Sequence, residues 1–187
     1  MTEPASEIRP NATYQDVHDA PAGMVAELVG GALHLQPRPR ARHAVAASRL
    51  GVKIGGPFDL GDGGPGGWWI IDEPELHLGA DVLVPDLAGW RRPRLETLPD
   101  QAFTLAPDWL CEVLSPRTRE FDLTEKRDRY AAAGVAHLWF VDPDARTLEA
   151  FALEGGRWVL IRALHGQAGV ALPPFEAVPF DLAALWA

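Results

Sequence analysis

The run "WLCEVLS", Trp109 to Ser115, places one carboxylate, Glu112, inside an otherwise apolar segment. Such a run is typical of a short, largely buried strand. Burying an unpaired carboxylate costs several kcal/mol or forces the group to take up a proton. The chain must therefore fold so that a cation, either a basic side chain or a metal ion, meets Glu112.

Length and composition predict a single domain. The chain has 187 residues, of which 47% are hydrophobic, enough for a sizeable core over residues 1–187. No apolar run approaches the ~18–20 residues of a membrane span, and the N-terminus lacks a signal-peptide pattern. Cys111 is the only cysteine, which suits a reducing compartment. We expect a cytoplasmic protein without membrane contacts.

The formal net charge is -9, which argues against a protein that coats nucleic acid, because such proteins need clustered Lys and Arg. It does not exclude an enzyme that meets phosphates through a bound divalent metal, where acidic side chains belong to the site. Basic stretches do occur at Arg38–His43 and Arg91–Arg94. Solvated loop charges and local phosphate contacts are both open interpretations of these stretches.

Apolar periodicity and turn residues predict an α/β or α+β sandwich with a mixed sheet. The predicted elements are a hairpin over 25–36, a helix over 40–54, a mobile glycine-rich loop at 61–67, strands at 68–78 and 81–90, a strand at 109–115, a helix from Asp122 to about Ala133, a strand at 137–142, a hairpin over 147–164 and a terminal helix at 180–186. The helix after Asp122 connects two strands, as a parallel pair requires.

Two carboxylates on neighbouring strands and one lysine form the candidate site. Asp86 ends the segment "VLVPD", and Glu112 lies in the next strand along the chain. Together they can hold one hard divalent cation through oxygen, and this metal ion is the expected partner of the buried charge on Glu112. Lys126, on the following helix, can orient the attacking water and offset charge on a phosphate. This combination favours metal-assisted phosphodiester hydrolysis.

The segments "VPDLAGW", "PDWLCEVLSP" and "DLTEKRDRYAAAGVAHLWFVDP" closely resemble the Uma-type endonuclease family, a bacterial group of the PD-(D/E)xK, restriction-endonuclease-like superfamily. The matching motifs run from about Glu27 to Pro143. The resemblance implies a restriction-endonuclease-like core, with a central mixed β-sheet flanked by helices and extra β-hairpins, and a Mg²⁺ or Mn²⁺ cofactor.

The resemblance assigns roles position by position. Asp86 and Glu112 become both the catalytic carboxylates and the metal ligands, and the backbone carbonyl of Val113 can complete the metal shell. Leu114 stands where the superfamily has its lysine. In the Uma-type pattern the catalytic lysine comes from the following helix, as Lys126 does here.

Several neighbours carry competing interpretations. Asp108 is predicted to be a turn residue, and Asp122 a helix N-cap with Glu125 as its capping-box partner. Lys126 is either the catalytic cation or a solvated helix lysine paired with Asp122. Tyr130 is either a core residue or a hydrogen-bond donor behind the metal ligands.

Five further residues carry predictions that follow from their positions in the sequence. Glu27 is either an additional ligand or a surface strand residue, and Glu73 and Glu75 could line the same pocket, although neither is assigned to the site. His43, beside basic residues at a helix start, is predicted to be exposed or capping. Trp90 follows Asp86 closely enough to stack on a base, although a core position is the main prediction for the tryptophans.

The sequence therefore predicts a metal-dependent endonuclease acting on nucleic acid, with DNA the favoured polymer. The alternative is a catalytically inactive module on the same fold that binds nucleic acid or a protein, which the acidic balance and Leu114 favour. No zinc-finger spacing or helix-turn-helix signal is present, so sequence-specific recognition is not predicted. A two-fold homodimer would suit an enzyme that cuts both strands.

Overall fold

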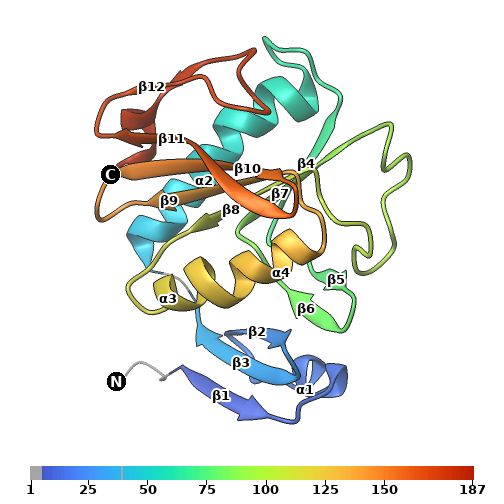
Figure 1. Cartoon of the computed structure of the whole chain (residues 1–187). Coiled ribbons are helices and arrows are strands. Elements are labelled where there is room, and N and C mark those ends of the chain that lie inside the picture. The colour runs from blue at the N-terminus through green and yellow to red at the C-terminus, as the bar shows by residue number, and fades with distance from the viewer. Residues whose placement is uncertain (1–5, 39) are drawn as a thin grey trace.

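A computed structural model describes residues 6–38 and 40–187 (Figure 1). Its main sheet has six strands in the order β11-β10-β9-β8-β7-β4, namely Arg157–His165, Thr147–Glu154, His137–Asp142, Trp109–Val113, Leu87–Arg91 and Trp68–Asp72. Strands β8 and β9 are parallel, and the other neighbours are antiparallel. The predicted mixed sheet and the predicted hairpin β10–β11 are confirmed.

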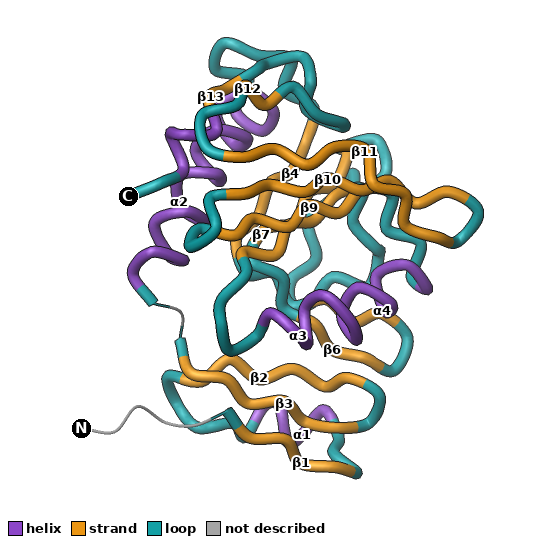
Figure 2. Tube along the Cα trace, turned by 60° about the vertical axis from the view of Figure 1, so that its left-hand side comes forward, coloured by secondary structure: helices purple, strands orange, loops and turns teal. Residues whose placement is uncertain are grey.

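A second sheet has five strands in the order β1-β3-β2-β6-β5, namely Glu7–Pro10, Ala32–Pro37, Met24–Val29, Asp81–Leu83 and Leu76–Leu78. The predicted hairpin is β2–β3, which turns at Gly30 and Gly31, both with positive φ. Helix α1 (Tyr14–His18) lies beside this sheet, and in Figures 1 and 2 the sheet lies below the main one.

The strands predicted at 68–78 and 81–90 are each divided between the two sheets, which corrects the sequence prediction. Strands β4 and β7 belong to the main sheet, whereas β5 and β6 belong to the second sheet. Pro74 and Pro85 lie at the two breaks, where a residue without an N–H cannot continue a strand ladder. Asp86 consequently stands where the chain crosses from one sheet to the other.

Helices cover both faces of the main sheet. On one face, α2 (Ala41–Ile54) continues into a π-helical turn η1 (Gly55–Leu60) and packs on Trp109, Cys111 and Val113 of β8. On the other face lies the crossover helix, which consists of α3 (Arg119–Phe121), η2 (Asp122–Lys126) and α4 (Arg127–Ala132). Figures 1 and 2 both show this helix between the two sheets.

The crossover helix begins earlier than predicted. Asp122 has helical dihedrals and is not an N-cap. Instead, Ser115 accepts two hydrogen bonds: its carbonyl oxygen accepts one from the N–H of Arg119, and its side-chain Oγ accepts one from the N–H of Thr118. The turn after β8 therefore leads directly into the helix.

Strand β8 determines which way Glu112 points. Side chains alternate along a strand, so Glu112 projects to the face of Leu110 and Leu114, opposite to Cys111 and Val113. That face is covered by α4, and Leu114 packs there in an apolar cluster with Tyr130.

The C-terminal segment forms β12 (Gly169–Val170), β13 (Phe180–Asp181) and a short 3₁₀ helix η3 (Leu182–Leu185). The helix predicted from residue 180 is therefore shorter and begins at Leu182, because the Asp181 carboxylate caps it by accepting the N–H of Ala183. Among the described residues, no helix combines the length and apolar character needed to cross a bilayer.

Candidate active site

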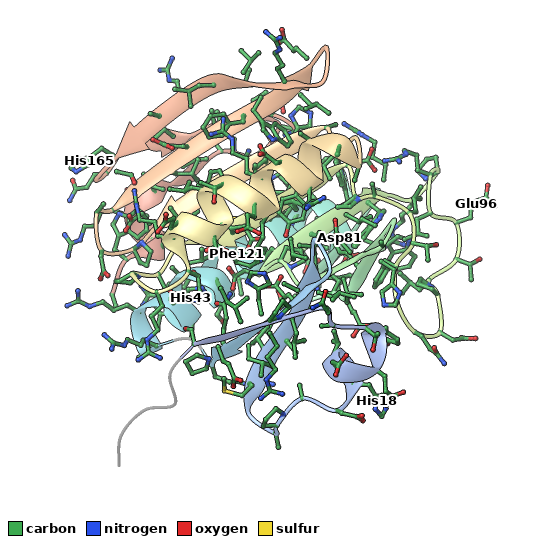
Figure 3. The ribbon with its side chains drawn as sticks, turned by 60° about the horizontal axis from the view of Figure 1, so that its bottom comes forward. His18, His43, Asp81, Glu96, Phe121 and His165 are labelled. Carbon is green, nitrogen blue, oxygen red and sulfur yellow. The ribbon has the colours of Figure 1, made fainter. Side chains whose placement is uncertain are left out.

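A cavity of about 390 Å³ opens between the second sheet, the start of α2 and the crossover helix. Its lining includes all three residues of the predicted site, Asp86, Glu112 and Lys126. It also includes Glu27, His43 and Asp122. Figure 3 views the molecule from this end and labels His43 on α2 and Phe121 on α3.

Glu112 is only 2% exposed, and its Oε1 has two partners. Tyr130 donates its hydroxyl hydrogen to this atom over 2.6 Å, and Lys126 Nζ lies 2.8 Å away. Burial raises the pKa of Glu112 well above its ordinary value; the Lys126 charge opposes this, and the carboxylates of Asp122, Asp86 and Glu27 add to it. The structure thus supplies a basic side chain as one partner for the buried charge.

Lys126 occupies the centre of the acidic group and is 3% exposed. Its Nζ lies 3.0 Å from Glu27 Oε1 and 3.7 Å from Asp122 Oδ1, in addition to its contact with Glu112. Burial acts to lower the pKa of Lys126, but Glu112 and Glu27 raise it well above its ordinary value. Lys126 is therefore a buried ammonium group, and the interpretation as a solvated helix lysine is wrong.

Glu27 reaches this group from β2 in the second sheet. It is buried, and its Oε1 accepts the N–H of Val84 over 2.8 Å as well as contacting Lys126. The alternative of a surface strand residue is thereby excluded. Glu27 ties β2 to the segment that leads into Asp86.

Asp86 is fixed from two directions. Its Oδ2 accepts the N–H of Val113 over 2.7 Å, and its Oδ1 lies 3.3 Å from His43 Nε2. Asp86 accepts the backbone N–H of the residue after Glu112 and lines the same cavity, so both carboxylates border one common space.

His43 is 8% exposed, so the prediction of an exposed or capping histidine is wrong. With Ala46, Leu50 and Ile54 it forms the buried face of α2. That spacing of three and four residues was readable from the sequence, but the flanking Arg40 and Arg42 suggested exposure. Burial lowers the pKa of His43, but the hydrogen bond and charge of Asp86 bring it above its ordinary value.

Asp122 also faces the cavity instead of capping a helix. Burial raises its pKa to about 6, and the Lys126 charge opposes that shift. Asp122, Lys126 and Tyr130 follow one another at four-residue spacing, which was predicted to put them on one helix face, and all three are buried.

The donor set fits a hard divalent cation. Four of the lining residues, Glu27, Asp86, Glu112 and Asp122, offer carboxylate oxygens, which are the ligands that hard divalent cations take. Within residues 6–38 and 40–187, no three His, Cys, Asp or Glu side chains form a ready-made cage. Mg²⁺ is commonly held by only one or two carboxylates, with water and substrate phosphate completing its shell, so two carboxylates suffice.

Three other acidic candidates have different surroundings. Asp108 accepts the N–H of Arg91 and pairs with Arg94 at 2.7 Å, which agrees with its prediction as a turn residue. Glu75 contacts Tyr14 and His77. Glu73 lies at the edge of the cavity, where it pairs with Arg38.

The arginine side chains of the basic stretch Arg91–Arg94 make contacts with other residues of this protein. Arg91 lies over the ring of Trp68, and Arg92 lies over Trp69 and pairs with Asp59. Trp90 is fully buried and stacks on Phe103, so the option of stacking on a base is wrong.

The basic stretch Arg38–His43, in contrast, contributes to the cavity. Arg38 and Arg40 line it, together with Arg117 from the turn after β8. Sequence reasoning left the role of this stretch open and missed Arg117, which carries no local signal of its position.

The comparisons with known proteins agree with this architecture. Residues 12–184 match the Uma2 family, which is described as "Putative restriction endonuclease". Among solved structures, one similar chain is described as a "putative nuclease belonging to DUF820" from Anabaena variabilis ATCC 29413. The TM-score is 0.70 at 19% identity, over 93% of this chain and 97% of that one. A search of curated proteins found no match.

Proposed function

We propose that this chain, which belongs to the Uma2 family, is a divalent-metal-dependent nuclease that hydrolyses phosphodiester bonds, with DNA as its substrate. The family description and the nuclease-like neighbour support the reaction class. The observation that carries the proposal is the buried Lys126 ammonium between Glu27 and Glu112, in a cavity that Asp86 and three arginines also line.

In this proposal Asp86 and Glu112 would hold Mg²⁺ or Mn²⁺, and the carbonyl of Val113 would be a further oxygen ligand. When bound, such a cation supplies Lewis-acid stabilisation of phosphate charge and lowers the pKa of bound water. His43 and the N–H of Val113 hold Asp86 in place, and Tyr130 holds Glu112. These contacts restrict the rotamers of the two carboxylates, as a preorganised site requires.

Lys126 acts as a cation in this mechanism. Its contacts with two carboxylates keep it protonated, so it donates hydrogen bonds to the attacking water or a phosphate oxygen. The water oxygen forms a bond to phosphorus while the bond to the leaving sugar oxygen breaks. One water proton ends on the leaving oxygen, which becomes a hydroxyl, and the other passes to solvent, which yields a phosphate monoester end and a hydroxyl end.

The inactive binding module remains the second candidate. The observation favouring it is that Lys126 already neutralises part of the charge on Glu112, and the core position of Leu114 leaves no lysine on β8. Both candidates use the same cavity and differ in whether the bound strand is cut.

We further propose that the chain acts as a single cytoplasmic domain over residues 1–187. The family match and the structural match each span most of the chain, which supports one unit. The homodimer stays a prediction.

The test is nicking of supercoiled plasmid by purified protein with Mg²⁺ or Mn²⁺. Glu112→Gln removes the charge at nearly constant shape, and Glu96→Gln is the matched control because Glu96 is exposed in the loop before β8 (Figure 3). We expect wild type and Glu96→Gln to nick equally and Glu112→Gln to be inactive. Equal cutting by all three would identify a contaminant, and no cutting by any would favour the binding module.

A further inference from the structure

The cavity has an acidic floor and a basic rim. On the floor, the side chains of Glu112 and Lys126 are only 3% and 4% exposed. At the rim, Arg38 follows β3, Arg40 precedes α2 and Arg117 lies between β8 and α3. The Arg38 side chain is 64% exposed. An anionic ligand therefore meets cationic groups at the entrance before it reaches the floor.

We propose, resting on the proposed nuclease function, that this cavity selects single-stranded phosphodiesters, such as flaps and frayed ends, over strands within an intact duplex. A volume of about 390 Å³ is in the range of clefts and cavities that bind small ligands, roughly 300–1,000 Å³. B-form DNA, whose major groove alone is ~12 Å wide, cannot enter such a space. A phosphodiester in a strand that has separated from the DNA duplex can enter the cavity, as happens in enzymes that extrude a nucleotide.

The second sheet forms a wall that keeps the cavity narrow. Glu27 of β2 is joined to the crossover helix through Lys126, and His34 of β3 stacks on Phe121 of α3 with ring centroids 4.2 Å apart. These contacts attach both strands of the β2–β3 hairpin to the crossover helix. A duplex cannot reach Lys126 without separating this wall from the helix.

The chemistry of the lining indicates recognition through phosphates. Among the residues that the structure describes, no Phe, Tyr or Trp lines the cavity. Stacking of bases on aromatic side chains is worth about 1–3 kcal/mol per base in proteins that bind single strands. Without such a platform, the cavity contacts the sugar-phosphate backbone, and we expect little dependence on base sequence.

One ion pair at the rim allows a test in which two substitutions should change the affinity for a single strand in opposite directions. Arg38 Nη1 lies 3.3 Å from Glu73 Oε2, across the entrance from the end of β3 to the connection between β4 and β5. Exposed pairs of this kind contribute little, so a phosphate can replace Glu73 as the partner of Arg38. Removing Arg38 should therefore weaken binding of a single strand, whereas removing the Glu73 charge should strengthen it.

The experiment measures fluorescence anisotropy of a labelled 20-nucleotide single strand and of the same sequence as a duplex, in EDTA, between 50 and 200 mM salt. We expect the single strand to bind more tightly. For Arg38→Gln we expect the slope of log K against the logarithm of the salt concentration to become shallower by about 0.7. The loss of affinity relative to wild type should therefore differ about 2–3-fold between the lowest and the highest salt concentration. Glu73→Gln should bind more tightly than wild type, and Arg162→Gln, on the exposed strand β11, is the control.

Cleavage of the same two substrates with Mn²⁺ separates this proposal from the proposed function. Cutting of both at equal rates would overturn the strand selectivity and leave the nuclease intact. No cutting, with single-strand binding that still depends on Arg38, would overturn the nuclease and support the selectivity. Equal affinity for the two probes, or no binding of either, would overturn the selectivity.

Discussion

Replacing Lys126 with methionine tests whether the site depends on a buried cation. The substitution nearly preserves the length of the side chain but leaves Glu27, Glu112 and Asp122 without the ammonium that lies 2.8–3.7 Å from them. Removing one partner of a buried ion pair costs about 3–5 kcal/mol, since the other charge stays buried. For a domain of this size each kcal/mol corresponds to about 2–4 °C in Tm. We expect a loss of about 6–20 °C at pH 8.

The pH dependence of this loss has a definite sign. Burial already raises the pKa of Glu112 above its unfolded value, and loss of Lys126 removes the main opposing charge. A carboxyl whose pKa is raised on folding takes up its proton more readily in the folded state, so stability increases as pH falls toward the unfolded pKa. The penalty of Lys126→Met should therefore be largest at pH 8 and smaller at pH 5.

The assay is thermal unfolding followed by circular dichroism at both pH values. Lys53→Met is the matched control, because Lys53 is exposed in the last turn of α2 and should change Tm little. Adding Glu112→Gln to Lys126→Met should recover part of the loss, since neighbouring charges are not additive. A Lys126→Met protein that unfolds within a degree of wild type at pH 8 would refute the reasoning.

Three further predictions follow from individual contacts. Tyr130→Phe removes the hydrogen bond to Glu112 and should cost about 1.5–3 kcal/mol in urea unfolding; an unchanged midpoint would contradict that contact. Mn²⁺ should raise the Tm of wild type, and Asp86→Asn should reduce this increase, whereas an undiminished increase would place the ion elsewhere. In a Gly89→Ala variant the new Cβ would lie 2.9 Å from Ile70 Cδ1 and 3.3 Å from Trp109 in the main sheet. We expect the free energy of unfolding in urea to fall by about 1–3 kcal/mol. An unchanged free energy would indicate that the sheet relaxes freely around the added methyl group.

The sequence was informative where one short segment carries the signal. The apolar run around Glu112 predicted β8, and the four-residue spacing of Asp122, Lys126 and Tyr130 predicted their shared face. Both are local properties, determined by the two-residue period of a strand and the turn of a helix. The need for a partner beside Glu112 also followed from the sequence, since the cost of burying a charge is independent of fold. A metal ion was the expected partner, whereas the structure shows the Lys126 ammonium there.

The failures came from signals that tertiary structure overrides. Asp122 followed by Glu125 has the pattern of a capping box, but the helix already begins at Arg119, after the turn at Ser115. His43 was predicted to be exposed from its charged neighbours, whereas packing against the main sheet buries its helix face. Glu27 could not be assigned, because its contact with Lys126 depends on how the second sheet lies against the crossover helix.

The long separation between Glu27 and Lys126 has a consequence for the protein as it is made. The two residues are 99 positions apart, and their contact closes the site. At about 5–20 residues per second, a ribosome adds Lys126 roughly 5–20 seconds after Glu27. Until then the nascent chain carries the acidic residues of β2 and β8 without their cation. A chain whose synthesis stops before the crossover helix cannot assemble this site, so prematurely terminated products should be harmless to nucleic acid.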